Sequence, residues 1–183
     1  GTALAAIIAS DGTPVTLLGR DAALATEINH ARRNQPYLPN IPLPAAITAT
    51  TDRAALAACP LWLVVPPAQH LREVLGGAPL ETRPTLILCS KGIEAGSHLL
   101  MAEVAAAIAP HSPLAVLSGP SFAAETARGM PTAVTLAAED LALATTLAAR
   151  IARPTFRPYA SDDVIGCEIG GAVKNVLAIA CGV

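Results

Sequence analysis

Short apolar segments alternate with segments of helical periodicity along most of the chain. The apolar segments, such as 61–66 and 84–90, have hydrophobic residues at consecutive positions, which is typical of strands buried on both faces. Helices are expected at 1–10, 21–33, 52–58, 68–77, 97–109, 121–128 and 139–152, and strands at 14–19, 46–51, 61–66, 84–90, 113–119, 131–137 and near 155–159. This alternation predicts a doubly wound α/β fold, with a mostly parallel sheet that helices cover on both faces.

Two segments depart from this alternation. Residues 34–46 contain four prolines, which predicts a loop that runs over the surface. From Ser161 onward glycine and alanine recur, which favours a closely packed helix that opens a second, helical domain. We therefore expect one domain over 1–160 and the start of another over 161–183. The chain begins in a helix and ends inside an apolar helix, so we expect both ends to be interruptions of a longer protein.

The composition is typical of a globular protein. Hydrophobic residues make up 52% of the chain and charged residues 14%, so there is enough apolar surface to offset the chain entropy lost on folding. The net charge of −2 and the scattered basic residues argue against nucleic acid as a partner. The longest apolar runs are far shorter than the roughly 20 residues of a membrane-spanning helix, so no membrane insertion is expected. No signal peptide is visible, and a cytoplasmic protein is expected.

Cysteines and histidines show neither a disulfide pattern nor a metal-binding pattern. The cysteines are at positions 59, 89, 167 and 181 and form no C-x-x-C pair. They lie in apolar segments, so all four are expected to be buried, free thiols. The four histidines lie apart from one another and from carboxylates at ligand spacing. We therefore expect no metal site.

Candidate chemistry is expected at the carboxyl ends of the strands, where open parallel sheets bind their ligands. Arg20 follows the strand predicted at 14–19. In dinucleotide-binding folds the second strand ends beside the adenosine ribose, where a carboxylate favours the free 2'-hydroxyl and an arginine accommodates a 2'-phosphate. Arg20 therefore favours NADP. A solvated arginine ahead of a helix cap at Asp21 would give the same sequence.

Lysine is rare in this chain, because ten arginines supply most of the positive charge and the lysines are Lys91 and Lys174 alone. An ammonium group can be desolvated and tuned to exchange a proton, whereas a guanidinium keeps its proton. Lys91 follows a buried strand, and Lys174 lies beside Asn175 in an apolar helix, on the same face as Gly170. Burial of Lys174 would lower its pKa and suit it to donate protons near neutral pH. The alternatives are a solvated charge for Lys91 and a side chain extended to solvent for Lys174.

A further candidate is the turn Ser118-Gly119-Pro120-Ser121, which follows a predicted strand and leads into a predicted helix. Proline suits the first turn of a helix, and Glu125 lies further inside it. Free backbone N–H groups at the start of a helix can bind an anion or the oxygens of a polar ligand. A capped helix without a ligand would show the same pattern.

These segments together carry a family resemblance. The motifs "KGIE" from Lys91, "SGPSFA-x-E" from Ser118 and "GGA-x-KN" from Gly170 occur in this order, with "LLGRD", "NQPYLPNIPLP" and "VVPPAQHLREVL" before them. In this order they resemble the bacterial-type NAD(P)-dependent glycerol-3-phosphate dehydrogenase family over essentially the whole chain. The resemblance implies a Rossmann-like dinucleotide-binding domain over 1–160 and the first helix of an all-α substrate domain over 161–183.

The activity that the resemblance implies is reversible hydride transfer between NADH or NADPH and dihydroxyacetone phosphate. The product is sn-glycerol 3-phosphate for phospholipid synthesis. By position, Lys174 matches the catalytic acid/base, which contacts the substrate and protonates its carbonyl oxygen. Lys91 matches a lysine that contacts both cofactor and substrate, and Gly119 and Ser121 match substrate contacts. The resemblance is compatible with a homodimer.

Besides Lys91, the cofactor contacts implied by the resemblance are Gly1, Arg20, Tyr37 and Ala123. Gly1 matches the last glycine of the family's glycine-rich fingerprint, whereas the preceding strand and two glycines have no counterpart in this sequence. The pyrophosphate site is therefore expected to be incomplete, and little activity is expected from these residues alone.

Two other functions stay open at this point. A related β-hydroxyacid dehydrogenase of the 6-phosphogluconate type shares the two-domain plan and a lysine on the first helix of the second domain. A nucleotide-sensing module without turnover would use the same cofactor-binding fold.

Overall fold

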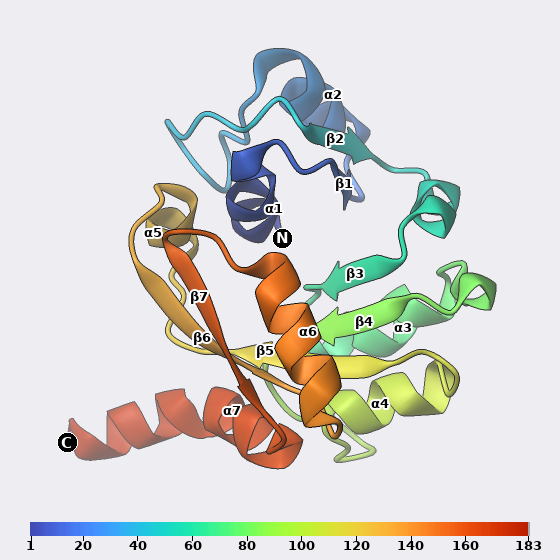
Figure 1. Cartoon of the computed structure of the whole chain (residues 1–183), viewed down its shortest axis with the longest axis vertical. Helices are drawn as coiled ribbons and strands as arrows, with labels where there is room; N and C mark the ends of the chain where they lie inside the picture. The colour runs from blue at the N-terminus through green and yellow to red at the C-terminus, as the bar shows by residue number, and fades with distance from the viewer. Residues whose placement is uncertain (183) are drawn as a thin grey trace.

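The computed structural model describes residues 1–182, without the side chain of Asn175, and its elements follow the predicted order (Figure 1). The α-helices are α1 (Thr2–Ile8), α2 (Ala22–Ala31), α3 (Leu71–Gly76), α4 (Met101–Ile108), α5 (Ala123–Ala127), α6 (Leu141–Ile151) and α7 (Val164–Cys181). The strands are β1 (Val15–Leu18), β2 (Ile47–Thr50), β3 (Leu61–Val64), β4 (Thr85–Leu88), β5 (Leu114–Ser118), β6 (Thr132–Ala137) and β7 (Phe156–Ser161). The segment predicted as a helix at 52–58 forms the 3-10 helix η2 (Arg53–Ala58), and α4 and α5 are shorter than expected.

The strands form two sheets, a division that the sequence pattern does not predict. One sheet has the order β3-β4-β5-β6-β7, and β1 and β2 form a separate parallel pair. The prediction of a mostly parallel sheet is confirmed, but β6 runs antiparallel to β5. The helix between these two strands, α5, has five residues and is too short to carry the chain back along the length of β5. The strand β6 therefore starts at the edge where β5 ends and runs in the opposite direction.

The residues of β4 show why the central strands are apolar at consecutive positions. Leu86 and Leu88 pack into a cluster with residues of α3 and α4, whereas Ile87 packs on the opposite face with residues of α6. All three side chains are fully buried. Because side chains alternate between the two faces of a strand, this arrangement confirms that helices cover the sheet on both sides.

The segment 34–46 is irregular and mostly exposed, as predicted, but it is also anchored in the core by apolar side chains, which the sequence did not predict. Leu38, Ile41 and Leu43 are buried in a cluster with residues of α1, α2 and β2. Prolines alternate with these apolar residues, so the backbone stays irregular while the apolar side chains turn inward.

Arg153, which follows α6, fastens the end of α1 to the rest of the domain. Its side chain is buried and donates hydrogen bonds to the carbonyl oxygens of Ile8 at 2.7 Å and Ala152 at 2.7 Å. Its Nε also lies 3.1 Å from Oδ2 of Asp11. The contacts with Ile8 and Asp11 join residues that are more than 140 positions apart in the sequence.

The helix α7 contacts the domain through its first half and projects away from it through its second half (Figure 1). Val164 and Cys167 pack against the cluster around α4 and β5. Val176, Leu177 and Ile179 are instead exposed. Of the helices in residues 1–182, none combines the length and the hydropathy needed to cross a membrane.

The cysteines are free, as predicted, but the expectation that all four are buried is wrong. Cys59, Cys89 and Cys167 are partly buried, whereas Cys181 is exposed because it lies on the last turn of α7. Burial raises the pKa of the Cys89 thiol to about 12 and that of Cys167 to about 11. These two thiols are therefore poor nucleophiles at neutral pH.

Candidate functional site

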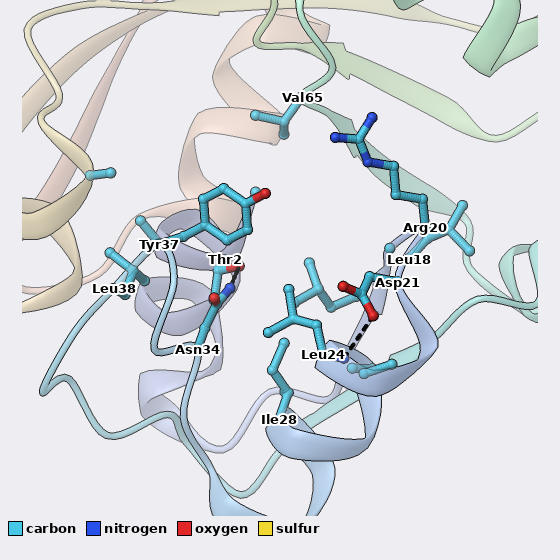
Figure 2. Close-up of a pocket in the computed structure, with 17 residues that line it drawn as sticks. Thr2, Leu18, Arg20, Asp21, Leu24, Ile28, Asn34, Tyr37, Leu38 and Val65 are labelled. Atoms are coloured by element: carbon cyan, nitrogen blue, oxygen red, sulfur yellow. Dashed lines mark hydrogen bonds between the residues drawn. The ribbon is translucent and has the colours of Figure 1, made fainter.

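A cavity of about 600 Å³ lies where β1 and β3 end, between α1, α2 and the loop that carries Tyr37 (Figure 2). Four of the five residues expected to contact a cofactor line it, namely Gly1, Arg20, Tyr37 and Ala123, whereas Lys91 does not. Its remaining walls are mostly apolar, with Leu24 and Ile28 of α2 on one side. The structure thus brings together residues that lie more than 100 positions apart in the sequence.

A second cavity, of about 200 Å³, adjoins the first and lies beyond β4 and β5. Lys91 and Ser121 line it, together with Ser118 at the end of β5. Gly1 and Ala123 line both cavities. Two of the four residues expected to bind substrate therefore lie next to residues expected to bind cofactor, whereas Gly119 and Lys174 do not line this cavity.

Lys91 is held at the mouth of the smaller cavity by the turn that follows β5. Its Nζ donates a hydrogen bond of 2.9 Å to the carbonyl oxygen of Gly119. Burial, and then the nearby positive charge of Lys174, lower the pKa of Lys91 below its ordinary value. The lysine is therefore both fixed in position and easier to deprotonate than a solvated lysine.

Gly119 occupies a position in which a larger residue would not fit. A Cβ there would lie 2.9 Å from Cα of Val134 and 3.2 Å from the carbonyl oxygen of Ala133, both on β6. These neighbours are backbone atoms, which cannot move aside independently. The close approach of the turn to β6 fixes the carbonyl group that holds Lys91.

Lys174 is exposed, so the expectation of a buried, glycine-lined niche around it is wrong. A Cβ on Gly170 would meet nothing within 4 Å, so this glycine does not form the wall of a niche for Lys174 in the described part of the chain. The neighbouring glycine is the closely packed one, because a Cβ on Gly171 would lie 2.7 Å from Oγ of Ser118 and 3.5 Å from Cγ of Lys91. Lys174 is three residues after Gly171 and shares its helix face, and its charge is close enough to Lys91 to act on the pKa of that lysine, but Lys174 does not line the smaller cavity.

The helix expected at 121–128 begins later than predicted, at Ala123, and Phe122 at its N-cap makes no side-chain capping bond. Ser121 lies ahead of the helix, and its backbone N–H donates to the carbonyl oxygen of Gly119 at 3.0 Å. Its N–H is therefore not free for an anion, although its exposed side chain lines the smaller cavity.

Arg20 and Asp21 have separate roles at the end of β1. The carboxylate of Asp21 accepts hydrogen bonds from the backbone of Ala23 and Leu24, so it caps α2 as the sequence suggests. The exposed side chain of Arg20 extends along the opening of the larger cavity, opposite the ring of Tyr37 (Figure 2). The site therefore presents a guanidinium group and an exposed aromatic ring to a ligand.

Two carboxylates that the sequence did not single out have structural roles outside the two cavities. Glu168 of α7 is buried and accepts a hydrogen bond of 2.9 Å from the backbone N–H of Ala102, in the first turn of α4. Burial raises the pKa of this carboxyl above its ordinary value. The sequence signal that could have identified Glu168 is a single acidic residue in a mostly apolar helix.

Glu94 of "KGIE" forms a bidentate pair with Arg72, with hydrogen bonds of 2.8 and 2.9 Å. This pair lowers the pKa of Glu94 to about 2 and identifies Glu94 as a structural residue.

Two buried polar atoms in the described chain have no hydrogen-bond partner, and both belong to residues that line these cavities. They are Oδ1 of Asn34, at the larger cavity, and Oγ1 of Thr126, at the smaller one. Buried polar groups are usually paired, so unpaired ones indicate groups that a ligand or water satisfies. Together with the volume, the apolar walls and Arg20, they fit a dinucleotide. The described residues contain no cluster of side chains that could hold a metal ion.

Comparison with known proteins gives a consistent result. Residues 1–144 match the family described as NAD-dependent glycerol-3-phosphate dehydrogenase N-terminus. The glycerol-3-phosphate dehydrogenase (NAD(P)+) of Novosphingobium aromaticivorans is 58% identical over 186 residues, and that of Sphingopyxis alaskensis is 56% identical over 183 residues. Each alignment covers the whole of this chain and 55% of the relative. The crystal structure of a glycerol-3-phosphate dehydrogenase from Coxiella burnetii has a TM-score of 0.88 and 37% identity, over 99% of this chain and 56% of that one.

Proposed function

Since this chain belongs to the NAD-dependent glycerol-3-phosphate dehydrogenase family, we propose that it is the cofactor-binding part of an enzyme that reduces dihydroxyacetone phosphate to sn-glycerol 3-phosphate with NADPH or NADH. The chain spans about 55% of the length of the curated relatives it matches. The observation that carries the proposal is the junction of the two cavities, one lined by Arg20 and Tyr37 and the other by Lys91 and Ser121. The product would supply phospholipid synthesis.

The larger cavity would hold the dinucleotide through Gly1, Arg20, Tyr37 and Ala123. When bound, the nicotinamide supplies the hydride. The exposed ring of Tyr37 suits stacking against a flat base, and the guanidinium of Arg20 suits bidentate contact with a phosphate. The carboxylate of Asp21 is occupied at the start of α2 and does not compete for the ribose 2'-hydroxyl. These contacts favour NADPH, with NADH as a second cofactor.

The smaller cavity would hold the substrate between two ammonium groups. Lys91 lines this cavity, and repulsion from the nearby Lys174 contributes to the lowered pKa of Lys91. An anionic phosphate placed near both would relieve it, which favours a phosphorylated ketone over a neutral one. Gly119 and Ser121 would contact the substrate from the turn after β5.

In the proposed reaction Lys174 is the proton donor. Hydride adds to the carbonyl carbon, the electron pair of the C=O π bond moves to oxygen, and the ammonium of Lys174 gives that oxygen a proton. The ketone thereby becomes a secondary alcohol, and Lys174 is left neutral until solvent returns its proton. Because Lys174 is exposed, solvent can reprotonate it directly.

The test of this function is a substrate comparison with protein of the same length as the relatives. We expect dihydroxyacetone phosphate to support NADPH oxidation better than other ketones and aldehydes of similar size. A preference for oxidising a hydroxy acid such as 6-phosphogluconate would overturn the assignment in favour of the related β-hydroxyacid dehydrogenases. NADPH binding without turnover of any substrate would indicate a nucleotide-sensing module instead.

A further inference from the structure

Asn34 is an almost fully buried polar residue at the larger cavity, with 1% of its surface exposed. Its side-chain Nδ2 donates a hydrogen bond of 2.8 Å to Oγ1 of Thr2 in the first turn of α1. Its backbone carbonyl accepts from the N–H groups of Leu38 and Tyr37. One residue therefore fastens the Tyr37 loop to α1, at the edge of the proposed cofactor site (Figure 2).

The other end of the Asn34 amide is unused. Its Oδ1 is buried and has no hydrogen-bond partner within residues 1–182. A buried carbonyl oxygen without a partner destabilises the folded state, because it has lost its water and gained nothing in exchange. The side chain lines a cavity large enough for part of a dinucleotide, so a donor on a bound ligand can restore the missing hydrogen bond.

We infer that Asn34 is a cofactor-binding residue whose Oδ1 accepts a hydrogen bond from the adenosine half of NAD(P). This inference rests on the proposed function, because it takes the larger cavity to be the cofactor site. The adenosine half is indicated because Asn34 lines only the cavity that contains Arg20 and Tyr37, and does not line the one that contains Lys91. Adenosine offers two kinds of donor, the exocyclic amino group of adenine and the ribose hydroxyls.

The test combines protein variants with cofactor analogues and measures binding rather than turnover. The dissociation constant is determined from the fluorescence of the reduced nicotinamide for NADH, for its hypoxanthine analogue, which lacks the amino group, and for an analogue with a deoxygenated adenosine ribose. We expect the wild-type protein to bind one of these analogues about 3- to 10-fold more weakly than NADH, as the loss of one hydrogen bond predicts. We expect Asn34→Ala to bind NADH more weakly by a similar factor and to bind that same analogue no more weakly than NADH.

Two further variants separate ligand contact from a structural role. Thr2→Val removes the partner of Nδ2 but leaves Oδ1 in place, so it should keep the discrimination between NADH and the analogue. Asn34→Asp keeps an acceptor oxygen at the same position and should also keep this discrimination, which provides a second variant if Asn34→Ala does not fold.

Three results would overturn the inference. Equal binding of all three dinucleotides by the wild-type protein would leave Oδ1 without a ligand partner. Loss of discrimination in Thr2→Val, to the same extent as in Asn34→Ala, would assign Asn34 a structural role only. Discrimination that persists in Asn34→Ala would assign the contact to another residue. The proposed function alone would be overturned if a protein that binds NADH did not reduce dihydroxyacetone phosphate. Failure to bind any dinucleotide would overturn both the proposed function and the role of Asn34.

Discussion

The close packing of α7 on the end of β5 gives the most specific stability prediction. The adjacent glycines Gly170 and Gly171 of this helix differ in their surroundings, although replacing either with alanine would give the same gain in helix propensity. A Cβ at Gly170 would meet nothing within 4 Å, whereas a Cβ at Gly171 would lie 2.7 Å from Oγ of Ser118. Gly170→Ala is therefore a matched control for Gly171→Ala.

The size of the difference follows from two opposing terms. Alanine in the interior of a helix is more favourable than glycine by about 1 kcal/mol, so Gly170→Ala should raise the free energy of unfolding by about this amount. Gly171→Ala gains the same term but overpacks the contact with Ser118, at a cost of about 1–3 kcal/mol. Because the propensity term cancels, the two variants should differ by about 1–3 kcal/mol, with Gly171→Ala the less stable.

Urea unfolding of the 183-residue chain, followed by circular dichroism, measures this difference. The double variant Ser118→Ala/Gly171→Ala removes the hydroxyl that the new methyl group would meet, and it should recover most of the lost stability. Equal stability of Gly170→Ala and Gly171→Ala would refute the packing of α7 described here. Failure of Ser118→Ala to compensate would show that the strain arises elsewhere.

Three other predictions concern single residues. Arg20→Ala should weaken NADPH binding by about 10- to 100-fold and NADH binding much less, since a charge-assisted phosphate contact is lost. Equal losses of affinity for the two cofactors in binding titrations would exclude a phosphate-binding role. Glu168 has a raised pKa in the folded state, so its contribution to stability is present below about pH 4.5 and is lost as the pH rises. In urea titrations, the wild-type protein should therefore lose stability relative to Glu168→Gln between acid and neutral pH. Parallel plots of unfolding free energy against pH for the two proteins would contradict this. Arg153→Ala should lower the free energy of unfolding by about 2–4 kcal/mol because it removes two partly buried hydrogen bonds to Ile8 and the ion pair with Asp11, whereas a loss below about 1 kcal/mol would show that they contribute little.

The sequence was sufficient for features that depend on local pattern. Consecutive apolar residues at 84–90 predicted a strand buried on both faces, and Leu86 and Ile87 pack on opposite faces as expected. The carboxyl-edge rule placed Arg20 and Lys91 at the same side of the molecule, where the structure has adjoining cavities. Strand ends can be located from one sequence because they depend on local periodicity and on a general property of parallel sheets.

Features that depend on contacts between distant segments were not predicted. The direction of β6 depends on the length of α5, which was expected to be longer. Burial of Lys174 was inferred from apolar neighbours in the sequence, but the surroundings of a helical residue depend on what packs against its face. The roles of Asn34 and Glu168 depend on partners more than 30 and 60 positions away, which local spacing does not reveal.

The most direct test of the proposed mechanism is the rate of NADPH oxidation with dihydroxyacetone phosphate, compared between wild-type protein of the relatives' length and its Lys174→Ala variant. The mechanism predicts that the variant binds NADPH with unchanged affinity but turns over at least about 10²-fold more slowly, because the ketone oxygen has lost its proton donor. Turnover at the wild-type rate by Lys174→Ala would contradict it.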